Sequence, residues 1–328
     1  MLERPTIKVS VVMITYKHAA FIQQAVESIL NQETDFEVEL IIAEDKSPDN
    51  TKEIVSSIIG SHPKGHTIRY FRNEQNLGIM PNSKKALDMV RGEYIATCEG
   101  DDYWTDPLKL KKQVEFLDHN PSFAICFHNT RIEYFEGNLL PYLLNENIEK
   151  DVFTINDMIG EDEIWFMGTA SLMIRSVAFG KTPDWLTKSK SGDIPIIILA
   201  ARNGDIKYLP DVMAVYRKHE GGSSNTDFKD DETFLNNRIY MYSMLNEATD
   251  FKYDTLFKRN IARYVRMLIY AKQYVNNYPK RLWFSIKYIG MTFPKVIHLK
   301  EVIRDGVMPP FFINLSRKVK KTMGLIPD

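Results

Sequence analysis

The first 130 residues alternate short apolar runs with amphipathic stretches, and this alternation limits the fold more than any other feature of the sequence. The apolar runs have the length of buried strands, and the stretches between them have the spacing of helices packed on a sheet. Such alternation is typical of a doubly wound, mostly parallel α/β sheet. We predict strands at 9–14, 39–43, 67–72, 94–98 and 123–128, and helices at 20–30, 51–59, 81–90 and 108–117.

The pattern changes in the second half of the chain. Residues 131–151 lack clear periodicity, which predicts a hairpin or a lid. Beyond Gly221 the pattern becomes almost entirely helical. We therefore predict an α/β domain over 1–225 and a basic, aromatic-rich helical region over 226–328. The other elements predicted in the α/β domain are strands at 170–175, 206–209 and 212–216 and a helix at 195–202.

The composition is that of an ordinary globular protein, and 328 residues allow one large or two modest domains. Cys98 and Cys126 are too few for a disulfide framework, which favours a reducing compartment. The apolar run at 9–14 is too short for a signal peptide or a membrane span. We therefore expect a cytoplasmic protein.

Charge is distributed unevenly along the chain. Residues 251–328 contain 16 Lys and Arg against 4 Asp and Glu, a net charge of +12, whereas the whole chain carries −1 and the first 250 residues therefore −13. Aromatic residues interleave with this basic tail, which suits peripheral binding to the anionic inner face of a membrane. Two alternatives remain: the tail docks on the acidic domain, or it forms a homo-oligomer. We expect no nucleic-acid partner.

An acidic cluster follows the predicted strand at 94–98. Glu99, Asp101 and Asp102 stand directly after the apolar run, and ligands of open α/β sheets collect at the carboxyl ends of strands. Carboxylates crowded there repel one another unless a divalent cation neutralises them. The cluster is therefore either a metal site or a loop of acids before a helix that Asp106 caps.

Polar residues also follow the first two predicted strands. Glu44 or Asp45 can accept hydrogen bonds from a base or a ribose, and Tyr16 can stack on a ring. The alternative for Asp45, Ser47 and Asp49 is an Asx turn and cap of the next helix, and Ser47 or Asp49 can cap it even if Asp45 binds a ligand. There is no G-x-G-x-x-G after the first strand and no G-x-x-x-x-G-K-S/T in the sequence, which disfavours dinucleotide and P-loop binding.

Five motifs, in this order, closely resemble those of the family 2 glycosyltransferases of the GT-A fold. They are VSVVMITY at 9–16, EDKSPD at 44–49, NLG at 76–78 followed by Asn82, GEY at 92–94 and EGDDYWTDP at 99–107. Each motif alone is weak, but their order and spacing over residues 7–120 make the resemblance specific. It extends more weakly to about residue 225. Members of this family transfer a sugar from a nucleoside-diphosphate sugar and invert its anomeric centre.

The resemblance implies a donor site with Mn²⁺ or Mg²⁺ on an acidic Asp-x-Asp element. Glu99-Gly100-Asp101 matches that element, with Glu in place of the first Asp. Asp101 is the implied first metal ligand and Asp102 the second, and the cation would stabilise charge on the leaving nucleoside diphosphate. The donor contacts that the resemblance implies are Thr15, Tyr16, Glu44, Asp45, Asn76, Asn82, Glu99, Gly100 and Arg217.

A family element that supplies the catalytic base resembles SGDIP at 191–195. Asp193 would take the proton of the acceptor hydroxyl. Many relatives have Glu-Asp where this chain has Gly192 and Asp193, which leaves one carboxylate for the role. The alternative for Asp193 is a helix cap just before Pro195.

Two further segments match the family. YRKHEGGSS at 216–224 resembles an element in which His219 ligates the metal and neighbouring groups such as Arg217 enclose the diphosphate, and a structural His219 is the alternative. Trp165, Gly168 and Thr169 lie where relatives have acceptor-facing residues, and the alternative for Trp165 is a core position.

These features predict an inverting, metal-dependent glycosyltransferase that moves a sugar from a UDP- or dTDP-sugar to a glycan or lipid-linked acceptor in cell-surface polysaccharide assembly. A sugar nucleotidyltransferase is the alternative enzyme, but it should carry a Gly-rich basic loop after the first strand, unlike Thr15-Tyr-Lys-His18. A non-catalytic sugar-nucleotide or glycan-binding protein of the same fold is the alternative outside enzymes. Asp193 argues against it, because binding alone needs no base.

Overall fold

The computed structural model describes residues 7–137, 139–159, 166–222, 232–309 and 311. The chain divides into two compact units. One consists of Met1–Met158 with Glu163–Thr226, and the other of Ile159–Asp162 with Asp227–Asp328. The described part of the first unit contains the sheet, and that of the second is helical.

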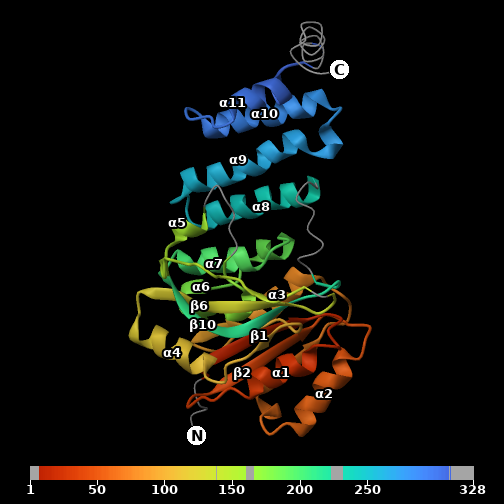
Figure 1. Ribbon diagram of the computed structural model, residues 1–328, viewed down its shortest axis with the longest axis vertical. Helices are drawn as coiled ribbons and strands as arrows, with labels where there is room; N and C mark the ends of the chain where they lie inside the picture. The colour runs from red at the N-terminus through yellow and green to blue at the C-terminus, as the bar shows by residue number, and fades with distance from the viewer. Residues whose placement is uncertain (1–6, 138, 160–165, 223–231, 310, 312–328) are drawn as a thin grey trace. The chain divides into compact units, whose positions relative to one another are not determined.

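The first unit is built on one sheet. Its strand order is β3 (Ile68–Arg72), β2 (Val38–Glu44), β1 (Val9–Thr15), β4 (Tyr94–Thr97), β9 (Met173–Arg175), β6 (Phe123–Tyr134), β10 (Asp205–Lys218) and β5 (Tyr103–Trp104). The first four strands are parallel, β6 is parallel to β10, and β9 joins these two groups as an antiparallel strand. The predicted mostly parallel α/β fold is confirmed (Figure 1).

Helices cover both faces of this sheet (Figure 1). On one face lie α1 (Ile22–Leu30), α2 (Thr51–Ser61) and α4 (Lys109–His119), and α3 (Ile79–Leu87) and α7 (Asp193–Ala201) pack on the other. Two single turns, α5 (Ile155–Met158) and α6 (Ser176–Phe179), lie near α7. The buried residues of α1 recur at helical spacing and join the core on the sheet, as an amphipathic helix requires. They are Ile22, Ala25, Val26, Ile29 and Leu30.

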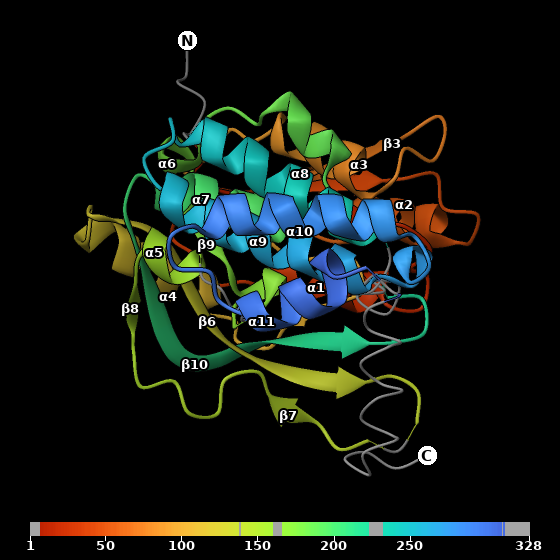
Figure 2. The same ribbon diagram turned by 90° about the horizontal axis from the view of Figure 1, so that it is seen from above.

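Two strands differ in detail from the prediction. β10 is one strand with bulges between Leu209 and Ala214 instead of the predicted pair at 206–209 and 212–216. The predicted strand at 170–175 is shorter, because Thr169–Ser171 forms a 3₁₀ turn before β9. The hairpin predicted within 131–151 is present, since β6 pairs with β7 (Tyr142–Leu143) (Figure 2). The last short strand, β8 (Val152–Phe153), pairs with β10.

The described part of the second unit is helical, which confirms the predicted helical C-terminal region. Its main helices are α8 (Glu232–Ala248), α9 (Asp254–Tyr270) and α10 (Tyr278–Thr292), followed by the short α11 (Leu299–Val302). α9 packs against both α8 and α10. Among the described helices, no segment has the length and hydrophobicity needed to cross a membrane.

Candidate active site

The loops after β1, β2 and β4 meet at one edge of the sheet. The strand register places the last residues of β1 and β2, Thr15 and Glu44, opposite each other, whereas β4 ends at Thr97, opposite Val12. The backbone N–H of Gly100 then donates to the carbonyl of Ile14 over 3.0 Å. The polar segments predicted to form a site are therefore neighbours in the structure, as expected for the carboxyl edge of a parallel sheet.

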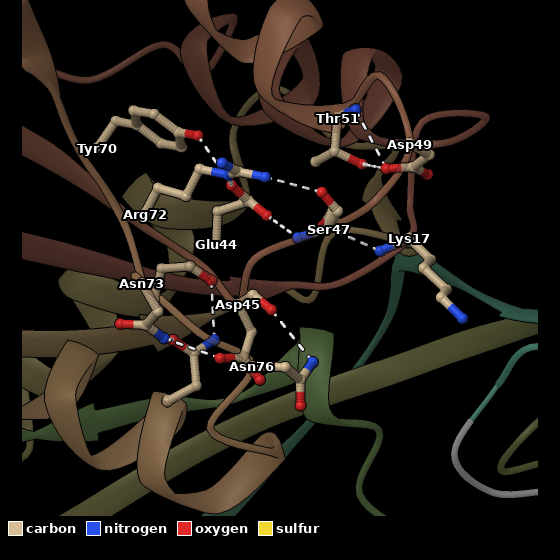
Figure 3. Close-up of polar contacts among 12 residues, drawn as sticks. Lys17, Glu44, Asp45, Ser47, Asp49, Thr51, Tyr70, Arg72, Asn73 and Asn76 are labelled. Atoms are coloured by element: carbon tan, nitrogen blue, oxygen red, sulfur yellow. Dashed lines mark hydrogen bonds and ion pairs between the residues drawn. The ribbon is translucent and has the colours of Figure 1, made fainter.

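Glu44 holds the loop after β2 in place (Figure 3). Its side chain is completely buried, and it accepts hydrogen bonds from the Ser47 N–H and, over 3.1 Å, from the Tyr70 hydroxyl. Arg72 forms an ion pair with it at 2.5 Å. These contacts give Glu44 a role in shaping the loop. Its predicted contact with the donor stays a prediction.

Asp45 organises the segment between β3 and α3 (Figure 3). It is 3% exposed and accepts hydrogen bonds from the Asn73 amide at 2.9 Å and from the Gly78 N–H at 2.8 Å. The exposed Asn76 donates to the Asp45 carbonyl, and the buried Asn82 accepts from Asn73. The predicted donor residues Asp45, Asn76 and Asn82 therefore belong to one network.

Two other residues of these loops have separate roles. Asp49 accepts hydrogen bonds from the N–H and the hydroxyl of Thr51, the first residue of α2, so the helix-capping alternative holds for Asp49 (Figure 3). Tyr16 is 37% exposed at the end of β1, and the Lys17 ammonium lies 5.2 Å from its ring centre. Tyr16 is therefore accessible for the predicted stacking on a base.

The acidic loop after β4 is buried. Asp101 is 9% exposed and Asp102 is fully buried, whereas Glu99 is partly exposed. Among the described residues, Asp101 Oδ1 and Asp102 Oδ2 have no hydrogen-bond partner. Asp106, not these acids, accepts from the Leu108 N–H just before α4. Asp106 therefore forms an Asx turn before α4, whose N-cap is Leu108 and not the predicted Asp106, and this turn leaves the buried acids unexplained.

The electrostatics of this loop are unfavourable without a counter-charge. Burial, followed by the charges of Asp101 and Asp193, raises the pKa of Glu99. Burial and the neighbouring Asp101 and Glu99 likewise raise the pKa of Asp102. For Asp101, burial favours the neutral acid, but the hydrogen bond with His219 and the nearby His18 outweigh it and lower its pKa. Crowded carboxylates of this kind are typical of a site that binds a cation.

Two histidines approach Asp101. His219 is 7% exposed, and its Nε2 lies 3.1 Å from Asp101 Oδ2. The Nε2 of His18 lies 3.5 Å from the same oxygen. We predicted His219 near the metal motif but assigned no role to His18. The only signal in the sequence was its position just after the first strand, at the same sheet edge as the acidic cluster.

Arg217 connects the acidic loop to α1. Its side chain is buried, donates to the Asp101 carbonyl at 2.8 Å and to Gln24, and lies over the Tyr103 ring at 4.3 Å. Its backbone N–H donates to Asp102. Burial lowers the pKa of Arg217. The structure thus gives Arg217 a positioning role, and its predicted diphosphate contact stays a prediction. Gln24 was missed because a helical position beside core residues carries no functional signal.

Asp193 is the first residue of α7 and is partly exposed. One carboxylate oxygen accepts hydrogen bonds from the Ser191 hydroxyl and from the Ile194 N–H. The N-cap residue of α7 is Gly192, so Asp193 lies in the first helical turn and is not the predicted cap. The charge of Asp193 also contributes, after burial and Asp101, to the raised pKa of Glu99. The predicted role of Asp193 as the base stays a prediction.

The segment predicted to face the acceptor lies beside β4. The Thr169 carbonyl accepts from the Thr97 hydroxyl at 2.6 Å, two residues before Glu99. Gly168 is buried so tightly that a Cβ there would lie 2.8 Å from the Thr130 hydroxyl. Trp165 lies outside the described residues, so its predicted role is not addressed by the structure.

The residues of the acidic loop fit a divalent cation. Two groups of three residues each have ligand atoms that lie within 4.8 Å of one another. One group is His18, Asp101 and His219, and the other is Glu99, Asp101 and Asp102. Both contain Asp101, one of whose oxygens is buried without a partner. Mg²⁺ and Mn²⁺ both take carboxylate oxygens in proteins, and transition ions also take imidazole nitrogen. Asp101 is therefore the central candidate ligand.

The fold and this sheet edge together define a glycosyltransferase of the GT-A class, and comparison with known proteins gives the family. A sequence profile described as Glycosyl transferase family 2 matches residues 10–179. The chain belongs to this family. The prediction of a family 2 glycosyltransferase of the GT-A fold is thereby confirmed.

Three similar proteins illustrate the relationship. An uncharacterized protein of Mycobacterium tuberculosis is 33% identical over 252 residues, which are 73% of this chain and 67% of that protein. The GalNAc(5)-diNAcBac-PP-undecaprenol beta-1,3-glucosyltransferase of Campylobacter jejuni is 33% identical over 147 residues, 44% of each protein. The crystal structure of S. aureus TarS 1–349 with UDP-GlcNAc superposes with a TM-score of 0.57 at 17% identity, covering 87% of this chain and 89% of TarS 1–349, which shows the shared fold.

Proposed function

We propose that this chain is an inverting glycosyltransferase that uses a divalent cation, Mn²⁺ or Mg²⁺, and a UDP- or dTDP-sugar. The single observation that carries the proposal is the buried Asp101. One of its oxygens has no hydrogen-bond partner among the described residues, two imidazoles lie within 3.5 Å of the other oxygen, and the charge of Asp193 contributes to the raised pKa of the neighbouring Glu99. A metal-dependent inverting displacement uses a cation to stabilise the leaving diphosphate and a base to accept the proton of the acceptor hydroxyl.

The donor would lie along the carboxyl edge of the sheet. Tyr16 would stack on the base, and the network of Asp45, Asn76 and Asn82 would meet the nucleoside. A cation bound by Asp101 and His219, with Asp102 and Glu99 nearby, would neutralise the charge that develops on the leaving nucleoside diphosphate. Arg217 would keep the acidic loop in position through its bond to the Asp101 carbonyl.

Asp193 would be the base. In an inverting displacement the acceptor oxygen forms a bond to the anomeric carbon while the bond to the diphosphate breaks, and the hydroxyl proton passes to the carboxylate of Asp193. One oxygen of that carboxylate is held by Ser191 and Ile194, which fixes its orientation. Gly168 and Thr169, beside Thr97, would contribute to the acceptor side, together with Trp165.

The acceptor we propose is a glycan or lipid-linked saccharide in cell-surface polysaccharide assembly, at the cytoplasmic face of the membrane. The similar Campylobacter enzyme is named for a substrate on an undecaprenol diphosphate, and the structurally similar TarS binds UDP-GlcNAc. The first name supports a lipid-linked acceptor for this chain, and the second supports a UDP-sugar donor.

Nucleotide binding tests this function directly. We expect UDP or dTDP with Mn²⁺ to raise the melting temperature of the full chain, because a ligand that binds only the folded state stabilises it by about 2.7 kcal/mol at 100 times its Kd. The measurement is a thermal-shift panel of nucleotides and nucleotide sugars, each with and without Mn²⁺. No shift with any nucleotide would contradict the proposal and favour a glycan-binding protein. Turnover that releases diphosphate from a nucleoside triphosphate would indicate a nucleotidyltransferase instead.

The exposed face of α10 supports peripheral membrane binding. Phe284 and Tyr288 are buried on one side of the helix, whereas Trp283, Ile286 and the following Phe293 are 53%, 60% and 76% exposed on the other. The Lys287 ammonium lies 5.1 Å from the Trp283 ring centre, beside this apolar face. An apolar face edged by lysine in a region of net charge +12 is complementary to an anionic lipid surface.

Replacing Trp283 and Phe293 together with alanine is expected to weaken binding to phosphatidylglycerol-containing vesicles about tenfold or more, because burial of a large apolar side chain contributes roughly 1.5–3 kcal/mol. Co-sedimentation at low and high salt is the measurement. Val177→Ala removes an 82% exposed apolar side chain from the first unit and is the control. Equal vesicle binding by the double variant and the parent would show that this face of α10 does not bind the membrane. A change of sedimentation coefficient instead would indicate that the face joins two copies of the chain.

A further inference from the structure

We propose that His18 is a protein ligand of the cation. With Asp101 and His219 it completes a site of two imidazoles and one carboxylate that selects Mn²⁺ and related transition ions over Mg²⁺. This inference rests on the proposed cation dependence and adds a ligand and a metal preference to it. Of the two groups that share Asp101, the ion would bind to the one with the two histidines and not to the one with Glu99 and Asp102.

The spacing of the donor atoms fits a shared ion. His219 Nε2 and His18 Nε2 lie 3.1 Å and 3.5 Å from the same oxygen, Asp101 Oδ2. Bonds of about 2.1 Å to a transition ion separate neighbouring ligand atoms by about 3.0 Å at right angles and about 3.4 Å at tetrahedral angles. The two imidazole rings are almost perpendicular, at 87°, with centres 6.1 Å apart. They therefore point edge nitrogens toward Asp101 without stacking on each other.

The backbone holds His18 in position from both sides. Lys17 has a left-handed backbone, with φ of 61°, which turns the chain at the end of β1. The Ser47 hydroxyl accepts from the Lys17 N–H, and Asp49 accepts from the Ala19 N–H, so the loop after β2 fixes both neighbours of His18. The His18 carbonyl then accepts from the Ile22 N–H at the start of α1. These contacts fix the backbone of His18 and therefore the direction in which its side chain leaves the loop.

Gly100 is the reason that the imidazole can reach the acidic loop. A Cβ on residue 100 would lie 2.9 Å from His18 Nδ1 and 2.7 Å from the Thr15 hydroxyl oxygen, closer than real side chains approach. The middle position of the acidic motif therefore has to be glycine while His18 packs there. His18 and Gly100 form a matched pair that brings the second imidazole to Asp101.

The donor types determine the metal preference. Mg²⁺ favours oxygen ligands and retains its waters, whereas Mn²⁺, Co²⁺ and Zn²⁺ accept imidazole nitrogen readily. A site with one histidine and several carboxylates would discriminate weakly between Mg²⁺ and Mn²⁺. Adding a second imidazole moves the donor set toward nitrogen. We expect the intact site to bind Mn²⁺ more tightly than Mg²⁺, with His18 responsible for part of the difference.

The test is titration of the full chain with MnCl₂ and with MgCl₂, with and without UDP. Free Mn²⁺ is measured by electron paramagnetic resonance, and Mg²⁺ binding by calorimetry. His18→Gln is expected to reduce Mn²⁺ affinity about tenfold or more and Mg²⁺ affinity much less. Gly100→Ala should also reduce Mn²⁺ affinity, because it displaces the imidazole while keeping it in the chain. His66→Gln, which changes an exposed histidine before β3, is the control.

Spin-echo spectra of bound Mn²⁺ provide a readout that a merely structural role would not change. Nitrogen modulation from two imidazoles is expected in the parent and from one in His18→Gln. Unchanged Mn²⁺ affinity and modulation in a folded His18→Gln variant would overturn the assignment of His18 and place the ion among Glu99, Asp101 and Asp102. A parent chain that binds neither cation, even with UDP, would contradict the cation dependence under the proposed function, which is a separate failure.

Discussion

Asp193→Asn is expected to reduce kcat by about 10²- to 10⁴-fold while leaving the binding of UDP with Mn²⁺ unchanged. Asparagine can keep the hydrogen bonds that the carboxylate makes with Ser191 and Ile194, so the start of α7 should stay in place. What the variant loses is the ability to accept a proton from the acceptor hydroxyl. The measurement combines turnover of a donor and acceptor pair with thermal shift by UDP.

A matched control separates loss of the base from loss of charge. Asp184, 96% exposed on its side chain, precedes α7, and Asp184→Asn removes the same charge without approaching Glu99. We expect parental turnover from this variant. Full turnover by Asp193→Asn would exclude Asp193 as the base and leave only its helix-start role.

Asp101→Asn is expected to abolish cation binding and most turnover. Asp101 lies in both candidate ligand groups, so no alternative set in the described structure replaces it. The amide keeps the size of the side chain but loses the negative charge that a divalent cation requires. The measurements are Mn²⁺ titration of the full chain and turnover at saturating Mn²⁺.

Folding of this variant has to be measured separately. The substitution removes the charge that pairs with His219 but also relieves repulsion with Glu99 and Asp102, so the melting temperature without cation should change little. Asp88→Asn, at an exposed ion pair with Lys84, is the control for a lost surface carboxylate. Turnover in Asp101→Asn that equals the parent's and survives a chelator would contradict metal catalysis at this loop.

The sequence predicted most of the fold because its signal is local. Apolar runs and helical spacing lie within single elements, so β1 to β4 and α1 to α4 were found close to their observed bounds. β10 was divided in two because Pro210 interrupts the pattern, and proline normally excludes a strand interior. In the structure the register shift between Leu209 and Val212 accommodates it as a bulge, which depends on pairing with β6.

The site could be predicted only where residues follow strands. The acidic loop was identifiable because its charged residues directly follow an apolar run, and this signal does not depend on distant parts of the chain. The surroundings of Arg217 were not, because Gln24 is 193 residues away and Asp101 is 116 residues away. The position of His18 after the first strand was too weak a signal to assign it a role, since a single histidine becomes informative only once Asp101 and His219 are known to lie beside it.

Arg217 lies at the end of β10 and His219 just after it, so their contacts with the acidic loop can form only when the first unit is almost complete. His219 comes 118 residues after Asp101, so nearly the whole unit has left the ribosome before their contact can exist. Until then the acidic loop lacks both Arg217 and His219, and His18 is the imidazole already available to Asp101. Contacts of such long separation close late. The centre that we propose for catalysis is therefore among the last parts of the unit to assemble, so its presence in a nascent chain would mark the completion of the sheet.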